Sequence, residues 1–252
     1  MDKEVLFEIK DNVAIVTLNR SHKRNAISKR MIEQLSEIIS ELKGMPLKYL
    51  LLTGAGNEAF CAGGDLNDFH GQMNEKEAYA LLSPMKDVLF QIATLPYPTV
   101  AWMNGTARGG GMELASACDF RVANESGTYG FVQGNLGIST GWGGGTLLYK
   151  RIQPTDAYFW LVHADVRTAF QLKDIQFVQD IVDSNDFEKS LLLKSFSNRS
   201  VDQMQLWKNQ FLKTISIEQL KIDMENEVKA CSKLWESDAH KEAVNQFFQK
   251  NN

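Results

Sequence analysis

Three consecutive glycines, Gly109 to Gly111, constrain this chain more than any other feature of its sequence. They follow an apolar run, Thr99–Met103, that is typical of a buried strand, and Glu113 stands in the first turn of the helix expected after them. Because glycine has no side chain, the backbone N–H groups of such a bend can approach a ligand atom closely. The helix directs further N–H groups and the positive end of its dipole toward the same point. We therefore expect a site that stabilises an oxyanion and moves a proton beside it.

A second segment, upstream, repeats this arrangement. Residues Tyr49–Thr53 predict a buried strand, and after a loop comes the sequence Phe-Cys-Ala-Gly-Gly-Asp-Leu at 60–66, where small residues open an expected helix. An oxyanion hole needs two N–H donors at about 2.7–3.1 Å from the oxygen, and two strand–loop–helix units can supply one each. A single Gly-Gly pair is more often an ordinary tight turn. Two such units beside a glutamate favour the functional interpretation.

Composition and charge exclude several classes of function. The 252 residues are 44% hydrophobic and 23% charged, which is ordinary for a soluble protein of one large domain or one domain with an appendage. The net charge of −4 is unsuited to nucleic-acid binding. No apolar run reaches the roughly 18 residues of a membrane span, the N-terminus has no apolar signal-peptide core, and the three cysteines are odd in number and widely spaced. We expect a cytoplasmic protein with reduced thiols and with no membrane or nucleic-acid partner.

The hydrophobic pattern predicts alternating strands and helices, followed by helices alone. Val5–Ile9 and Ala14–Leu18 are expected to form an antiparallel pair, and Ser28 is expected to cap a helix that ends near Leu42. A further helix is predicted over 75–95. Beyond about residue 182 three helical stretches remain, over 186–196, 201–215 and 217–248, with an apolar stripe that packs at least in part on the chain's own core.

These segments, taken together and in order, resemble the crotonase superfamily, also called the enoyl-CoA hydratase/isomerase family. The matching pieces are Leu-Asn-Arg at 18–20, Asn-Ala-Ile-Ser at 25–28, the run 60–66, Asn-Gly at 104–105, the run 109–114 and the run 118–123. The resemblance implies an α/β fold, a crotonase-type spiral of ββα units over residues 1–195, with an α-helical C-terminal segment over 196–252. It also implies a homotrimer or a hexamer (a dimer of trimers), with the C-terminal helices around the trimer axes.

The resemblance further implies that the substrate is an acyl-CoA thioester. Its thioester oxygen is expected between the N–H groups of Ala62 and Gly110, with Glu113 as general acid or base. The four histidines do not cluster with other metal-ligating residues, so no metal is expected, and coenzyme A enters only as part of the substrate. The cations before residue 25 are expected to contact its phosphates rather than form a merely solvated loop. The predicted substrate-binding residues are Lys23, Arg24, Ala26, Gly63, Gly64, Asp65, Leu66, Gln133 and Trp142.

One departure from the family pattern bears on the reaction. Hydratases of this family use two glutamates, the second twenty residues after the first, and here that position holds Gln133. An amide cannot take or give a proton at neutral pH, although it can hold a water or a ligand by hydrogen bonds. Alkene hydration needs one group to activate water and another to supply the α-proton. The sequence therefore predicts enolate chemistry, as a lyase or an isomerase, with Glu113 as its sole acid or base.

Decarboxylation of a carboxyacyl-CoA is the alternative reaction. The segments 131–138 and 142–144 and the run Gly-Asp-Leu-Asn at 64–67 resemble the ethylmalonyl-CoA decarboxylase branch of the superfamily. Decarboxylation yields the thioester enolate directly, so it needs only an acid to return a proton. An apolar wall such as Trp142 favours loss of a carboxylate by replacing its water, although the same tryptophan is equally well explained as a core aromatic.

Two alternatives belong to other classes. A non-catalytic scaffold with the crotonase fold is suggested by the missing second glutamate, although Glu113 and both glycine loops are intact. A nicotinamide- or flavin-dependent enzyme is suggested by Gly-Ala-Gly-Asn-Glu-Ala at 54–59, which fits the dinucleotide fingerprint. That fingerprint also needs a helix directly afterwards and an acidic residue at the end of a later strand, and neither is predicted here.

Overall fold

Two sheets form the framework of the molecule. The computed structural model describes residues 3–69 and 73–250, without the side chains of residues 66, 67 and 247–250. In the six-stranded sheet the order is β1 (Val5–Lys10), β2 (Val13–Leu18), β3 (Tyr49–Gly54), β5 (Thr99–Met103), β7 (Phe120–Asn124) and β10 (Asp180–Val182). In the four-stranded sheet the order is β4 (Ala59–Cys61), β6 (Thr106–Arg108), β8 (Thr128–Gly130) and β9 (Arg167–Thr168). Only the β1–β2 and β8–β9 pairs are antiparallel among these neighbours.

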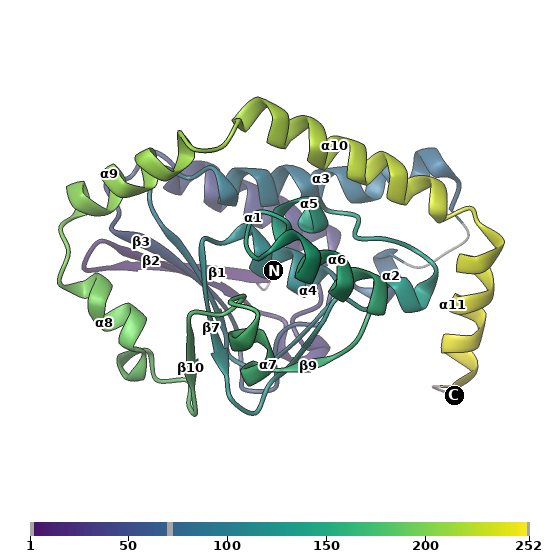
Figure 1. The fold of residues 1–252 in the computed structure, drawn as a ribbon, viewed down its shortest axis with the longest axis horizontal. Coiled ribbons are helices and arrows are strands. Elements are labelled where there is room, and N and C mark those ends of the chain that lie inside the picture. The colour runs from purple at the N-terminus through teal and green to yellow at the C-terminus, as the bar shows by residue number, and fades with distance from the viewer. Residues whose placement is uncertain (1–2, 70–72, 251–252) are drawn as a thin grey trace.

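The chain winds as a spiral, because each turn adds one strand to each sheet and then a helix. β3 and β4 are followed by α2 (Leu66–Phe69) and α3 (Glu75–Ala93); β5 and β6 by α4 (Gly110–Ala117); and β7 and β8 by a short 3-10 turn and α5 (Gly144–Leu148). Parallel strands need such crossovers. The expected α/β spiral of ββα units is therefore confirmed, and each crossover loop ends at the same side of the sheets (Figure 1).

The predicted caps and turns form as expected from the residues that encode them. Asp11 and Asn12 take left-handed backbone angles, φ +51° and +62°, between β1 and β2. The Ser28 hydroxyl accepts a hydrogen bond from the Met31 N–H at 3.0 Å at the start of α1 (Lys29–Leu42). Asn74 and Glu77 form a capping box at the start of α3.

The C-terminal part of the chain is helical, as predicted. After α6 (Pro154–His163) and α7 (Ala169–Asp174) come α8 (Leu191–Ser197), α9 (Val201–Leu212), α10 (Ile217–Leu234) and α11 (Asp238–Lys250). The helix predicted over 217–248 is therefore two helices, because helical structure is interrupted at residues 235–237. α10 runs alongside α3 (Figure 1), and its apolar residues Leu220, Met224, Val228 and Cys231 are buried in the chain's own core. The domain division at 195/196 falls inside α8 and stays a prediction.

Helix α4 is fixed at its C-terminal end by two arginines. The guanidinium of Arg121 is fully buried and donates to the carbonyls of Ala115 and Cys118 at 3.4 and 2.8 Å. Arg151 donates to the carbonyls of Ser116 and Ala117 at 3.0 and 3.3 Å. Cations suit the negative end of a helix dipole and satisfy carbonyls that have no partner inside the helix. The helix that begins with the glycine triplet is therefore anchored at its far end.

Candidate active site

A pocket of about 620 Å³ opens where the crossover loops end. It gathers residues from segments that are far apart in the sequence: the loop before α1, the start of α2, the start of α4, and residues 132–142. Of the predicted site residues, it is lined by Lys23, Arg24, Ala26, Ala62, Gly63, Gly64, Asp65, Gly110, Glu113, Gln133 and Trp142. Leu66 begins α2, and its side chain lies outside the described residues.

The first glycine loop offers a different N–H donor from the one that the sequence predicts. The Ala62 N–H donates to the Arg24 carbonyl at 3.0 Å, so the prediction that it binds a substrate oxygen is wrong. The Gly63 carbonyl and the Asp65 N–H both bond to Ile27, at 2.8 Å each. The residue between Gly63 and Asp65 forms a parallel bridge with Ile27, and in such a bridge its own N–H points away from the Ile27 strand. That residue is Gly64, and its N–H has no backbone acceptor in the described part of the chain.

The second glycine loop leaves a donor at the start of α4. Gly109 has φ +49° and ψ −114°, a conformation that a side chain disfavours, and its carbonyl accepts from the N–H groups of Met112 and Glu113 at 2.9 and 3.1 Å. Gly110 is the first residue of the helix, so its N–H has no partner within the helix. A Cβ at Gly110 would lie 2.1 Å from the Trp142 ring, and one at Gly63 would lie 3.5 Å from the Gly110 nitrogen. The two loops are therefore in contact, and only glycine fits beneath Trp142.

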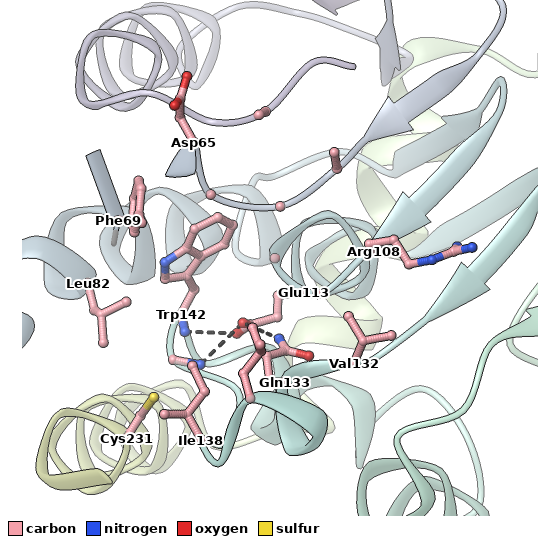
Figure 2. Close-up of a pocket in the computed structure, with 18 of the residues that line it drawn as sticks. Asp65, Phe69, Leu82, Arg108, Glu113, Val132, Gln133, Ile138, Trp142 and Cys231 are labelled. Carbon is pink, nitrogen blue, oxygen red and sulfur yellow. Dashed lines mark hydrogen bonds between the residues drawn. The ribbon is translucent and has the colours of Figure 1, made fainter. Parts of the chain in front are cut away.

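Glu113 is 2% exposed, and N–H groups surround its carboxyl. Oε1 accepts from Gln133 Nε2 at 2.9 Å and from the Gly141 N–H at 3.2 Å. Oε2 accepts from the N–H groups of Trp142 at 2.8 Å and Gly144 at 3.0 Å. Figure 2 shows the Gln133 amide and the Trp142 backbone directed at the carboxyl, beside the Trp142 indole. Four donors match the four lone-pair positions of a carboxylate, so the side chain is held in one orientation.

Burial raises the pKa of Glu113 to about 8, and the nearby carboxyl of Glu227 adds to this effect. The backbone N–H groups of Trp142, Gly141 and Gly144 act in the opposite direction, because they favour the charged form. Desolvation has the larger effect on the pKa, so Glu113 is suited to hold a proton and to act as an acid. Glu227 belongs to α10, and the sequence pattern gave no reason to connect it with this site.

Gln133 occupies the position of the second family glutamate and contacts the first one. Its Nε2 donates to Glu113, as described above, while its Oε1 is buried without a hydrogen-bond partner in the described structure. Gln133 thus orients Glu113 but transfers no proton. The contact itself follows from the spiral, which sets the start of α4 against the turn after β8.

Two cations stand at the mouth of the pocket, and a third tethers the loops behind them. Lys23 and Arg24 are exposed, and Arg24 has a left-handed φ of +50°. Asp65 is buried and pairs with the Arg20 guanidinium at 2.7 Å, and Arg20 also donates to the Ala26 carbonyl at 2.7 Å. The carboxylate of Asp65 therefore supports the loop instead of facing the substrate. Arg20 was part of the motif, but nothing in the sequence indicated its role.

Two asparagine side chains brace the loop after β3. Asn25 Nδ2 donates to the carbonyls of Ala55 and Ala59 at 3.0 and 2.8 Å, and Asn104 Nδ2 to those of Gly54 and Gly56 at 2.9 and 2.7 Å. This loop leads into strand β4 and not into a helix. The dinucleotide fingerprint at 54–59 is therefore not a dinucleotide site, because no helix N-terminus stands there to bind a pyrophosphate.

The inner end of the pocket is apolar. Phe69 and Trp142 meet edge to face with ring centroids 5.7 Å apart, and Leu82, Ile138, Cys231 and Trp235 line the remaining wall. Arg108 also lines the pocket, but its guanidinium bonds to Thr128 and points away from Glu113 (Figure 2). Burial raises the pKa of the Cys231 thiol to about 12, so it stays protonated. Cys231 and Trp235 come from α10 of the same chain, a contribution that the sequence analysis missed.

Comparison with known proteins places this geometry in a family. Residues 8–252 match the model of the enoyl-CoA hydratase/isomerase family. The chain belongs to this family. It is 32% identical over 174 residues to mouse methylglutaconyl-CoA hydratase, covering 69% of this chain and 55% of that one. It is 39% identical over 143 residues to rat ethylmalonyl-CoA decarboxylase, covering 56% of this chain and 48% of that one. The aligned segments thus span about half the length of these two relatives.

The fold of the family extends over the whole chain. The crystal structure of an enoyl-CoA hydratase from Bacillus halodurans superimposes with a TM-score of 0.85 at 24% identity, covering 97% of this chain and all of that one. None of the described helices is long and apolar enough to cross a membrane. In residues 3–69 and 73–250 no group of three or more His, Cys, Asp or Glu side chains is arranged to hold a metal ion.

Proposed function

We propose that this chain acts on an acyl-CoA thioester through an enolate, with Glu113 as its acid or base. The N–H groups of Gly64 and Gly110 support the proposal, because neither has an acceptor among the described residues and both belong to loops in contact at the pocket. A thioester oxygen between them would develop negative charge against two fixed donors. Lys23 and Arg24 at the mouth suit the phosphates of coenzyme A. The reaction uses no cofactor beyond the CoA of the substrate.

The reaction proposed is the decarboxylation of a 2-carboxyacyl-CoA. The observation that carries it is that Glu113 is the one carboxyl at the inner end among the described lining residues, while an amide, Gln133, bonds to it where hydration would need a second proton-transferring group. The bond between Cα and the carboxylate breaks, its electron pair passes to the thioester oxygen, and CO₂ leaves. Glu113 then gives its proton to Cα and regains one from solvent. Hydration requires a second proton-transferring group, and Gln133 cannot supply it.

The apolar inner end favours the same reaction. The cations that line the described pocket are Lys23 and Arg24 at the mouth and Arg108, which bonds to Thr128. A carboxylate beside Trp142 and Phe69 would therefore lose water without gaining an ion pair, which favours its loss as neutral CO₂. A neutral Glu113 does not repel it. The similarity to ethylmalonyl-CoA decarboxylase agrees with this choice.

A substrate panel tests the proposal. The purified chain is incubated with ethylmalonyl-CoA, methylmalonyl-CoA and crotonyl-CoA, and release of CO₂ and loss of the alkene are both followed. We expect CO₂ release from a carboxyacyl-CoA and little hydration of crotonyl-CoA. Brisk hydration with Gln133 in place would overturn the choice of reaction and leave a hydratase. Absence of turnover together with absence of CoA binding would support a non-catalytic scaffold.

For assembly, we propose a homotrimer or a dimer of trimers. Large apolar side chains are exposed on α6 and α7, among them Tyr158, Phe159, Val162 and Phe170, and on α9, where Trp207 is 47% exposed. Large exposed apolar side chains are typical of interaction surfaces. Light scattering is expected to report a mass of three chains or a multiple of three. A monomer at micromolar concentration would contradict this proposal.

A further inference from the structure

A second carboxyl, on the half-buried residue Glu227, lies behind the pocket on α10, the helix that also supplies Cys231 and Trp235 to the pocket wall. Glu227 is on α10 and is not among the residues that line the pocket. Its Oε1 accepts from the Gly145 N–H at 3.1 Å, and its Oε2 accepts from the N–H and the hydroxyl of Thr146 at 2.6 and 2.7 Å. The hydroxyl of Thr140 also bonds to it. No salt bridge to Glu227 is present in the described structure.

One short stretch of backbone, residues 140–146, connects this carboxyl to Glu113. The N–H groups of Gly141, Trp142 and Gly144 bond to Glu113, and those of Gly145 and Thr146 bond to Glu227. The same stretch carries the Trp142 indole, which packs on Gly110. Moving this backbone would therefore disturb the acid, the aromatic wall and one oxyanion donor together.

We propose that Glu227 is a positioning residue: from outside the pocket it holds segment 140–146 in place and so fixes the orientation of the Glu113 carboxyl and its affinity for a proton. This inference rests on the proposed function, because it concerns how the acid of that reaction is prepared. A negative charge on Glu227 opposes ionisation of the buried Glu113, because no cation of the described structure stands between the two carboxyls. Glu113, the member that faces the substrate, therefore binds its proton more tightly.

The surroundings of the pair support this division of roles. The titratable groups that act electrostatically on Glu113 or Glu227 are the thiol of Cys231, on α10, and the phenol of Tyr149, directly after α5; neither is cationic. Burial raises the pKa of Glu227 while its bonds to Thr140, Gly145 and Thr146 lower it. Each carboxyl accepts four hydrogen bonds, but Glu113 is buried whereas Glu227 is half-buried and closer to solvent. Charge is thus better accommodated on Glu227.

The test compares Glu227→Gln with Glu225→Gln, which removes the same charge from the same helix. Glu225 pairs with the buried Lys86 and the exposed Lys229, and it has no hydrogen bond with Glu113 or with segment 140–146 in the described structure. In Glu227→Gln we expect the alkaline limb of the pH–rate profile to move down by about one pH unit. We also expect kcat to fall by about tenfold and KM to change little. In Glu225→Gln the alkaline limb is expected at the same pH as in the unmodified chain. A limb unmoved by Glu227→Gln would overturn the inference.

A second variant and a second readout keep the test decisive. Glu227→Asp keeps the charge, so it is expected to keep the alkaline limb even if kcat falls, which a purely structural role would not predict. Infrared difference spectra of the protonated carboxyl band, assigned with Glu113→Gln, follow the proton without turnover. If no substrate turns over, the proposed function fails, whereas a band that disappears at lower pH in Glu227→Gln still supports the inference. A band at unchanged pH would overturn it.

Discussion

At the mouth of the pocket Lys23 and Arg24 are exposed to solvent, whereas at its inner end Glu113 is 2% exposed and has four N–H donors. Exposed charges are screened by water and salt, so each contributes a small and adjustable amount to binding. A buried carboxyl cannot be screened, and its protonation depends on a few fixed neighbours. Under the proposed function, the mouth of the pocket therefore attracts the substrate and the inner end performs the chemistry. Each variant described below affects one of these two ends more than the other.

The largest expected effect belongs to Glu113→Gln. Loss of the one carboxyl at the inner end of the described pocket is expected to lower kcat for CO₂ release by about 10²–10⁴-fold, with KM little changed. The new amide N–H₂ would face N–H donors that now bond to the carboxyl, so we also expect a loss of about 1–3 kcal/mol in the free energy of unfolding. Kinetics and thermal unfolding measure both. An active variant would show that another group supplies the proton.

Gly110→Ala is expected to have the next largest effect. The added Cβ would lie 2.1 Å from the Trp142 ring, so the indole or the start of α4 must move. We expect kcat to fall by about 10²-fold, because an oxyanion donor is displaced. The matched control is Gly44→Ala, where a Cβ has no neighbour within 4 Å. Equal activity of the two variants would remove Gly110 from the site.

Gln133→Glu is expected to change the balance between reactions. The new carboxyl would stand where Gln133 Nε2 now donates to Glu113 at 2.9 Å, and its charge would repel the substrate carboxylate. We expect CO₂ release to fall by about tenfold, a change of about 1.4 kcal/mol in the barrier. Gln133→Met serves as a control that removes the donor without adding charge. A tenfold gain in crotonyl-CoA hydration, with CO₂ release intact, would contradict the proposed decarboxylation.

The smallest effect is expected at the mouth. Lys23→Ala with Arg24→Ala is expected to raise KM by several-fold and to leave kcat unchanged, since these cations are proposed to contact only the CoA phosphates. The difference from the unmodified chain should diminish as salt is added. Lys43→Ala, an exposed lysine after α1, is the control. Calorimetry with free CoA gives the affinity directly, and an unchanged affinity would exclude both residues from the site.

Much of the fold follows from local signals in the sequence. The hairpin at Asp11 and Asn12, the Ser28 cap and the glycine triplet each depend on residues within a few positions, so they are predictable without the tertiary structure. The family motif then orders these pieces into a spiral, and the structure confirms it.

The parts of the site that the sequence did not predict depend on long-range contacts. Ala62 and Gly64 both lie in the small-residue run, and only the pairing with Arg24 and Ile27 decides which N–H remains available. Helix α10 supplies Glu227, Cys231 and Trp235. Its apolar stripe predicts that the helix packs on the rest of the chain, but it does not predict which element it contacts. Asp65 was expected to contact the substrate, and its pairing with Arg20 became visible only in three dimensions.

The arginines at the far end of α4 determine when the entropy of ordering the helix N-terminus is lost. Because Arg121 and Arg151 already bond to the last carbonyls of the helix, its first N–H is fixed before any ligand arrives. The entropy of ordering that dipole is therefore lost during folding and not during each encounter with a substrate. A thioester oxygen that enters the pocket meets a donor that does not need to reorient, so little reorganisation energy opposes the development of charge.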